Sequence, residues 1–342
     1  MNRNLVLILI ALLLVLLLRI QAEAPLQRQS NLETEKEIYY FTKLREILSG
    51  MPKYLLPEPQ ASLLSGMVLG VKEDLPKEFK QNLRDTSTIH IVVVSGQNLT
   101  LLGGFILAGA ALIGRKKAIV LSILVCLFYT FLTGFAVPVI RAFIMLSFSS
   151  VAQILGREKI DWWILGITAL IMLIYNPNWL LSISFQLSFL ATIGVVIVAP
   201  QLIRLLKSMP DILREDLAVS IAAQAMTWPI IAVNFHQVSL IGILVNSLIL
   251  WTVPGIMITG AVSIITSFFI FPLGQLMALI PGVLLTYFVY IVNFFSKVSF
   301  SSIYIGKISY LVWMGYYFLL LGIFLMIYNK NKRRQLKDVA QS

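Results

Sequence analysis

Residues 89–100 have the sequence IHIVVVSGQNLT, and this stretch divides the chain into two parts of different character. Residues 21–88 are mostly polar and often charged, whereas apolar segments follow one another from residue 91 to residue 328. The junction places Ser95, Gly96, Gln97 and Asn98 at the start of the first apolar segment. Polar groups in hydrocarbon need partners inside the protein, so we expect function to begin at this interruption.

The composition indicates a membrane protein. Of the 342 residues, 58% are hydrophobic and 13% are charged, where a soluble domain has roughly 25% charged residues. We predict an all-α fold: a polytopic helical membrane protein with broken or re-entrant helices. The single cysteine, Cys126, excludes an intrachain disulfide. Two histidines, without a CxxC or HExxH motif, leave almost no material for a metal site, so we expect no metal and no cofactor.

Four regions are predicted along the chain. The apolar run at 5–18 favours an uncleaved signal-anchor helix over 1–20, and a cleaved signal peptide is the alternative. Residues 21–88 are few for an independent core, which predicts a short extracytoplasmic helical segment, a surface hairpin that covers the membrane domain. Residues 89–328 form the multi-pass membrane domain, and 329–342 form a basic cytoplasmic tail.

Basic clusters between the apolar segments predict the orientation. The clusters near residues 115–117, 157–159 and 204–207 and the basic tail are expected in the cytoplasm, which places residues 20–88 outside. The stretch 240–271 is too long for one straight crossing and has Pro254-Gly255 at its middle, so we expect it to be broken or re-entrant. The predicted apolar segments are 91–113, 118–136, 138–156, 162–176, 179–199, 217–235, 240–271, 273–297 and 308–328.

Further polar or helix-breaking residues interrupt the later segments. Arg141, three residues after Pro138, is the only charge between Lys117 and Arg157. An intramembrane arginine is expected to have a function or a buried partner, or else to extend to the outer interface. The remaining candidates are Gln186, Ser188, Gln224, Thr227, Pro229, Asn246 and His236.

Each of these candidates also has a structural explanation. Ser188 suits contacts between helices, and for Gln186 a structural and a functional role are equally supported. His236 is expected at the outer interface, where a histidine needs no special role. No acidic residue lies between Asp161 and Asp211, or between Asp216 and Asp338, so a path lined by these side chains suits a polyanion better than a cation.

In this order, the patches resemble the ComEC family of competence proteins, inner-membrane channels for DNA uptake. The opening motif of that family, a histidine, four apolar residues and Ser-Gly, is similar to His90 through Gly96. Pro138, Arg141 and Ala142 resemble its Pro-x-x-Arg-Ala element, and residues 185–194 resemble its FQLSFxATxG element. Residues 224–229 and Asn246 resemble later family positions, so the resemblance covers about residues 55–295.

The chain also departs from the family pattern. Asn98 stands where the family has a second histidine, which puts in doubt any role that needs an imidazole there. The external OB-like domain and the metallo-β-lactamase-like domain of many members have no counterpart, so we expect the membrane domain alone, without nuclease chemistry.

The resemblance implies a channel in the inner membrane that passes single-stranded DNA into the cytoplasm. Arg141 would contact phosphate, and the channel would be lined by the candidates from His90 to Asn246 named above. Phe185 and Phe189 are expected to pack in the core, with base stacking as the alternative. The expected partners are the lipid bilayer, an ATP-driven helicase and an external DNA receptor or nuclease, and assembly of several copies is compatible with the sequence.

Two other function classes remain open. A small-solute transporter is favoured by the broken helices. An intramembrane hydrolase would need Ser95 with His90 or His236, but a histidine five residues before a serine points away from it on a helix. We therefore expect no enzymatic activity.

Overall fold

The computed structural model describes residues 31–71, 75–92, 95–206, 209–235, 237–239, 241–298, 302–304 and 310–341. The predicted anchor helix over 1–20 and the candidate His236 lie outside these residues. The described part is helical apart from one antiparallel pair of three-residue strands, β1 (Gln237–Ser239) and β2 (Ser302–Tyr304). The predicted all-α class is therefore confirmed.

In the first half of the chain, the polar junction lies within a series of helices of very different lengths. Polar helices α2 (Asn31–Leu55) and α4 (Lys77–Asp85) flank α3 (Gln60–Leu69). After them come α5 (Ile89–Val92), α6 (Gly96–Ala108), α7 (Ala110–Ile113), α8 (Arg115–Leu132) and α9 (Val137–Ile154).

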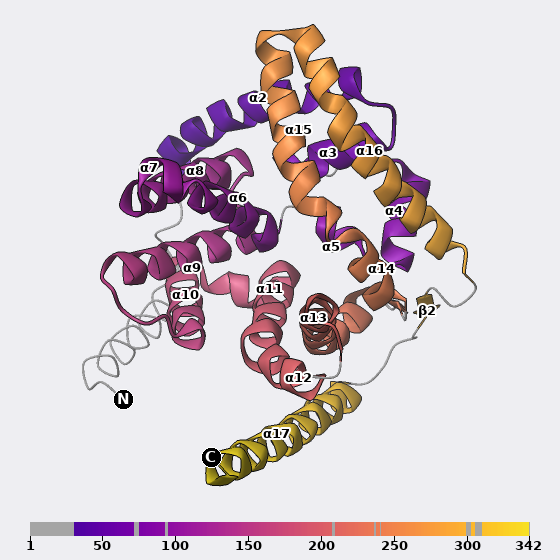
Figure 1. The fold of residues 1–342 in the computed structure, drawn as a ribbon. Coiled ribbons are helices and arrows are strands. Elements are labelled where there is room, and N and C mark those ends of the chain that lie inside the picture. The colour runs from indigo at the N-terminus through magenta and orange to yellow at the C-terminus, as the bar shows by residue number, and fades with distance from the viewer. Residues whose placement is uncertain are drawn as a thin grey trace.

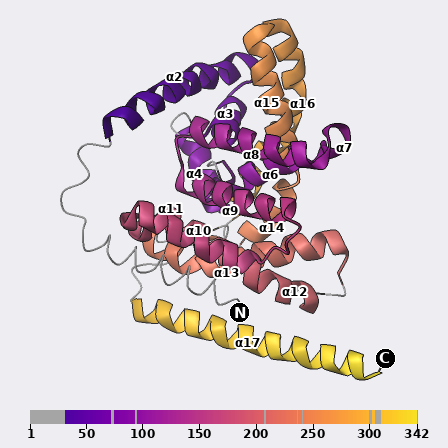
Figure 2. The same ribbon diagram turned by 90° about the vertical axis from the view of Figure 1, so that its left-hand side faces the viewer.

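The second half contains the remaining helices and helical turns. It begins with α10 (Asp161–Tyr175), the 3-10 turn η2 (Pro177–Leu181), α11 (Ile183–Ile193), the π-helical turn η3 (Gly194–Val198) and α12 (Ala199–Leu205). It continues with α13 (Asp211–Phe235), α14 (Gly242–Ile249), α15 (Thr252–Phe269), α16 (Phe271–Ser296) and α17 (Tyr310–Gln341). Helices α15 and α16 form a hairpin that projects from the other helices, and α17 runs along one side of the molecule (Figures 1 and 2).

Within the part of the chain that the structure describes, five helical stretches are long and apolar enough to cross a membrane. Each coincides with a predicted apolar segment, and together they indicate a polytopic membrane protein. They are Val137–Ile154, Ile183–Leu205, Arg214–Asn234, Thr252–Phe269 and Phe271–Ser296.

The segment 240–271 is broken, as predicted, although the break precedes the proline. Helix α14 ends at Ile249 and α15 begins at Thr252, so Pro254 lies in the first turn of α15. A proline is tolerated there because the first-turn N–H groups have no partner within the helix. The re-entrant path proposed for this segment stays a prediction.

The core forms around α3, which lies in the polar N-terminal part of the sequence. Leu63, Leu64 and Met67 are fully buried, and α3 packs against α2, α15 and α16. A Cβ atom placed at Gly260 in α15 would overlap the Leu64 side chain, so this glycine allows the two helices to approach closely. All residues from Ala61 to Leu69 are buried, and five of them belong to the main hydrophobic core, so α3 lies deeper than the expected hairpin at the surface.

Candidate functional site

The polar junction of the sequence is the beginning of a helix. Ser95 has an extended backbone (φ −116°, ψ 162°) and precedes α6, so that Gly96, Gln97 and Asn98 form its first turn. The Ser95 side chain makes no capping hydrogen bond to the helix. The backbone amides of this turn therefore receive no side-chain cap, and the positive end of the helix dipole lies at Gly96.

Arg141 lies against this helix end. A Cβ atom at Gly96 would overlap Nη2 of Arg141, and it would lie 3.0 Å from the Cβ of Ala142 and 3.1 Å from the carbonyl oxygen of Pro138. Only glycine allows the first turn of α6 to approach the first turns of α9 this closely. Two sources of positive potential, the dipole of α6 and the guanidinium group, are thereby brought together.

The guanidinium group is also bound to α11. Nη1 of Arg141 donates a hydrogen bond to the carbonyl oxygen of Ser188 at 2.5 Å, and a second one to the hydroxyl of Thr192. The Thr192 hydroxyl donates to the same carbonyl at 2.8 Å. Nε of Arg141 and Oγ of Ser188 are buried without a hydrogen-bond partner in the described chain. Arg141, on α9, thus contacts α6 and α11, and the protein leaves its Nε donor unused.

Asn98 has a different role from its neighbours, because its side chain connects α6 to α3. Its exposed fraction is 1%, and its Nδ2 donates to the carbonyl oxygen of Met67 at 3.0 Å. The hydroxyl of Tyr129 donates to the same carbonyl at 3.3 Å, and the hydroxyl of Ser95 donates to Oδ1 of Asn98 at 3.1 Å. Asn98, the residue that stands in place of a histidine of the ComEC family, is therefore buried, and both polar atoms of its side chain form hydrogen bonds.

Gln97 and His90 are exposed. Nδ1 of His90 lies 2.8 Å from the carbonyl oxygen of Ser87. A carbonyl oxygen only accepts, so Nδ1 carries the proton and Nε2 of the neutral ring is an acceptor. The Ser95 hydroxyl is directed to Asn98 and the His90 ring to Ser87, and neither contact resembles a nucleophile–base pair.

Gln224 and Thr227 lie on α13, and the Gln224 side chain reaches the connection that follows this helix. Nε2 of Gln224 donates to the carbonyl oxygen of Ser239 in β1 at 3.2 Å. A Cβ atom at the nearby Gly242 would lie 2.8 Å from the Cβ of Ser87 and 3.4 Å from Oγ of Ser239. The structure therefore brings the Gln224 region close to the residues that precede His90, which no pattern in the sequence indicated.

Three further candidates lie apart from Arg141. Nε2 of Gln186 donates to the carbonyl oxygen of Leu180 at 3.0 Å and so caps η2. Asn246 is buried in α14, and its Oδ1 has no hydrogen-bond partner in the described chain. Pro229 lies inside α13.

Phe185 and Phe189 are 5% and 7% exposed and contact each other within a cluster of buried residues, which confirms the expectation of core packing.

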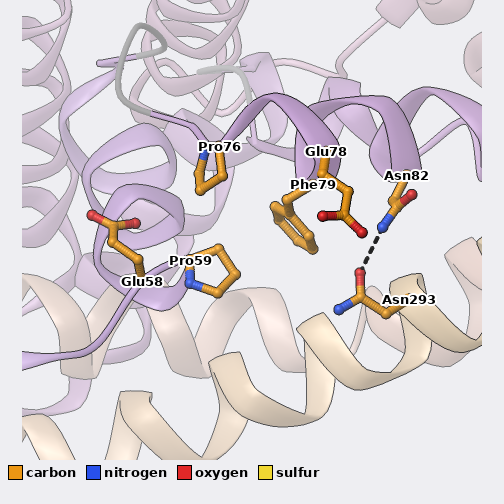
Figure 3. A pocket seen from close by; sticks show the side chains of 7 residues that line it. All are labelled: Glu58, Pro59, Pro76, Glu78, Phe79, Asn82 and Asn293. Carbon is orange, nitrogen blue, oxygen red and sulfur yellow. Dashed lines mark hydrogen bonds between the residues drawn. The ribbon is translucent and has the colours of Figure 1, made fainter.

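A pocket of about 240 Å³ lies elsewhere, where α4 and the residues before α3 and α4 meet α16 (Figure 3). Nδ2 of Asn82 donates to Oδ1 of Asn293 across this junction at 2.9 Å. The two carboxyl side chains at this pocket, Glu58 and Glu78, do not suit a polyanion. The pocket is lined by Glu58, Pro59, Pro76, Glu78, Phe79, Asn82 and Asn293, none of them a predicted site residue.

Sequence reasoning did not find all the participants. Met67 and Ser239 contribute backbone carbonyls, which no sequence pattern can identify as partners of a side chain. Thr192 differs from them, because it follows Ser188 by one helical turn and the spacing itself predicts that the two residues are neighbours. Of the residues described, no group of three or more His, Cys, Asp or Glu side chains could hold a metal ion.

The chain is similar to known proteins over most of its length. Residues 67–330 match the profile of the family described as Competence protein. The chain is 26% identical over 242 residues to ComE operon protein 3 of Bacillus subtilis, a match that covers 69% of this chain and 30% of that protein. It is 26% identical over 221 residues to the uncharacterised YcaI of Escherichia coli, covering 59% of this chain and 28% of the relative.

A third relative is an uncharacterised protein of Aquifex aeolicus, 30% identical over 230 residues, which are 67% of this chain and 52% of the relative. The chain thus spans between about a quarter and a half of the length of these relatives. No solved structure matches.

Proposed function

The chain belongs to the competence protein family, and from this premise we propose that it is a channel that passes single-stranded DNA across the cell membrane into the cytoplasm. The membrane part of the proposal has the support of five candidate spans. The DNA part depends on the family and on one feature of the site, the position of Arg141 at the first turn of α6.

Phosphate is the chemical group that suits this feature best. A helix N-terminus with uncapped amides attracts anions, and a guanidinium group binds phosphate through several donors. Arg141 keeps Nε free of protein partners while Nη1 holds α11 in place. Such a contact is independent of base sequence, as DNA uptake from any source requires.

The charge distribution supports a polyanion in the same way. Three long sequence stretches without acidic residues, 86–157, 162–210 and 217–337, contain the five candidate spans over most of their length. A carrier coupled to cations would be expected to have Asp or Glu at membrane depth. The bases have no obvious stacking partner in Phe185 and Phe189, because both rings are buried, so we assign recognition to the phosphates alone.

The remaining components belong to other proteins in this proposal. The sequence has no P-loop, so a separate ATP-driven helicase supplies the motor, and an external receptor or nuclease delivers the strand. We also propose that the basic tail is cytoplasmic and that the chain itself catalyses no reaction. A small-solute transporter stays the second candidate, because the α14–α15 break resembles the discontinuous helices of carriers.

Substitution of Arg141 tests the proposal directly. We expect Arg141→Ala to lower transformation by about 10- to 100-fold, the equivalent of ~1.5–3 kcal/mol for a hydrogen bond to a charged group. Arg141→Lys retains the charge but loses the planar array of donors, so an intermediate loss is expected. The measurement is transformation frequency, normalised to the amount of protein in isolated membranes.

Substitution of Lys117, an exposed residue in the first turn of α8, provides the matched control. Lys117→Ala removes one positive charge away from the site and should leave transformation within twofold of the wild type. Normal transformation in Arg141→Ala at normal membrane levels would remove this residue from the DNA path. Loss of small-anion accumulation without loss of transformation would favour the transporter instead.

A further inference from the structure

Pro229 leaves one carbonyl group of α13 without a donor inside the helix. The residue lies in the interior of α13, where each N–H normally donates to the carbonyl four residues earlier. Proline has no N–H, so the carbonyl of Ala225 loses its partner and is pushed outward by the ring. This occurs inside the candidate span Arg214–Asn234, where water is excluded and an unpaired carbonyl is costly.

Tyr316 supplies the missing donor. Its hydroxyl, on α17, donates to the carbonyl oxygen of Ala225 at 2.9 Å. The next residue, Tyr317, donates to the carbonyl oxygen of Met226 at 3.1 Å. The two contacts are not equivalent. The Ala225 carbonyl has no N–H donor four residues later in the helix, whereas the Met226 carbonyl can still accept from the N–H of Ile230.

The helix that these tyrosines contact carries part of the candidate site. Gln224 precedes Ala225 directly, and its side chain reaches Ser239 in β1. The hydroxyl of Thr227 donates to the carbonyls of Ala223 and Gln224 at 2.9 and 3.3 Å, so these carbonyls are also held by a side chain. The course of α13 at Pro229 therefore decides whether Gln224 can reach Ser239.

We propose that Tyr316 is a positioning residue: its bond to the carbonyl freed by Pro229 fixes the bend of α13 and connects α17 to the helix of Gln224 and Thr227. We call this contact the Tyr316 latch. Helix α17 lies along the side of the molecule in Figure 2 and also packs on α12. Displacement of α17 would leave the Ala225 carbonyl unpaired, so the latch favours the docked position of this helix.

A double-mutant cycle tests the latch in the purified full-length protein in lipid nanodiscs. Tyr316→Phe removes only the hydroxyl, and it should lower the thermal midpoint by about 1–3 °C. Pro229→Ala restores an N–H to the Ala225 carbonyl, so in that background Tyr316→Phe should have almost no further effect. Tyr317→Phe is the matched control, and its shift should be the same in both backgrounds.

Additive shifts for Tyr316→Phe and Pro229→Ala would overturn the proposal. If Pro229→Ala does not accumulate, the two tyrosine variants decide the matter, because the latch requires a larger shift for Tyr316→Phe than for Tyr317→Phe, and equal shifts would refute it. The midpoints are independent of DNA uptake, so the latch and the proposed DNA path can fail separately.

DNA uptake is the measurement that distinguishes a positioning role of Tyr316 from a contribution to stability alone. This part rests on the proposed function, and we expect Tyr316→Phe to lower transformation by about fivefold, the ratio that corresponds to one ordinary hydrogen bond. In the Pro229→Ala background, whatever its own level of transformation, Tyr316→Phe should cause no further loss, because the Ala225 carbonyl then has a donor within the helix. A loss of about fivefold in that background as well, in a cycle with coupled midpoints, would overturn the positioning role.

Discussion

At the scale of single residues, Asn98 shows how a polar side chain in an apolar segment can be structural. The sequence places it beside Gln97, with the same amide chemistry, yet Asn98 is buried and Gln97 is exposed. Asn98 uses its Nδ2 to hold the carbonyl of Met67 and its Oδ1 to accept from Ser95. Its neighbours in the motif are the better candidates for contact with DNA.

Conversion of each amide to a carboxylate separates the two roles. In Asn98→Asp the donor is replaced by an oxygen that faces the Met67 carbonyl, so we expect a loss of ~1–3 kcal/mol in stability and a lower thermal midpoint. Gln97→Glu makes the same chemical change at an exposed position and should leave the midpoint unchanged. Comparable losses in the two variants would contradict the structural role of Asn98.

Gly96 presents a second prediction at this scale, and it concerns function. In Gly96→Ala the added methyl group competes with Nη2 of Arg141 and meets the backbone of Pro138, so the guanidinium must leave the end of α6. We expect transformation to fall about tenfold, as for a lost charge-assisted contact. Gly104→Ala, in the same helix, adds a methyl group where no atom lies within 4 Å and should transform normally. Equal transformation by the two variants would argue against a role for the close approach at Gly96.

The sequence identified these residues but could not assign their partners. Arg141 was conspicuous as a lone charge, and the structure places it at the first turn of α6. The partner of Asn98 is a backbone carbonyl 31 residues earlier, and backbone carbonyls have no signature in a sequence. For the same reason, the release of the Ala225 carbonyl by Pro229 could be predicted, but its capture by Tyr316 could not.

At the scale of secondary-structure elements, breaks were easier to predict than burial. The interruption at Ser95–Asn98 and the divided segment 240–271 both appear as helix boundaries, because polar and helix-breaking residues act locally. Helix α3 was expected at the surface, and its burial depends on α15 and α16, which lie about 200 residues later in the chain. A ten-residue helix buried on all sides has no periodicity that would reveal this.

The burial of α3 makes a prediction about stability. Leu64 is fully buried against Gly260, so Leu64→Ala should cost ~2–5 kcal/mol and lower the amount of folded protein in the membrane. Leu279 in α16 is 63% exposed, on a surface suited to lipid, and Leu279→Ala removes the same atoms without a cavity. The thermal midpoint of the purified variants is the measurement. A small effect at Leu64, equal to that at Leu279, would show that α3 is dispensable to the core.

At the scale of the whole molecule, the arrangement of the basic segments supports the proposed orientation. The N-terminal end of α8, α12 and the C-terminal end of α17 all lie toward the same side of the molecule, the right-hand side of Figure 2. The sequence places Arg115–Lys117, Arg204 and the basic tail in these segments. Basic residues are concentrated on the cytoplasmic side of membrane proteins, so one side of this molecule is expected to face the cytoplasm.

Labelling of introduced cysteines decides the orientation of the chain in the membrane, because the native cysteine is not expected to react. Cys126 is fully buried and should not react with a membrane-impermeant maleimide in intact spheroplasts. Glu78→Cys, at an exposed position of α4, should be labelled in intact spheroplasts. Lys116 and Lys159 are also exposed. The introduced cysteines in Lys116→Cys, in Lys159→Cys and, in the tail, in Lys337→Cys should react only after permeabilisation. Labelling of the tail in intact spheroplasts would invert the topology and place Arg141 on the exit side of the strand, so this result bears on the direction of transport as well as on the fold.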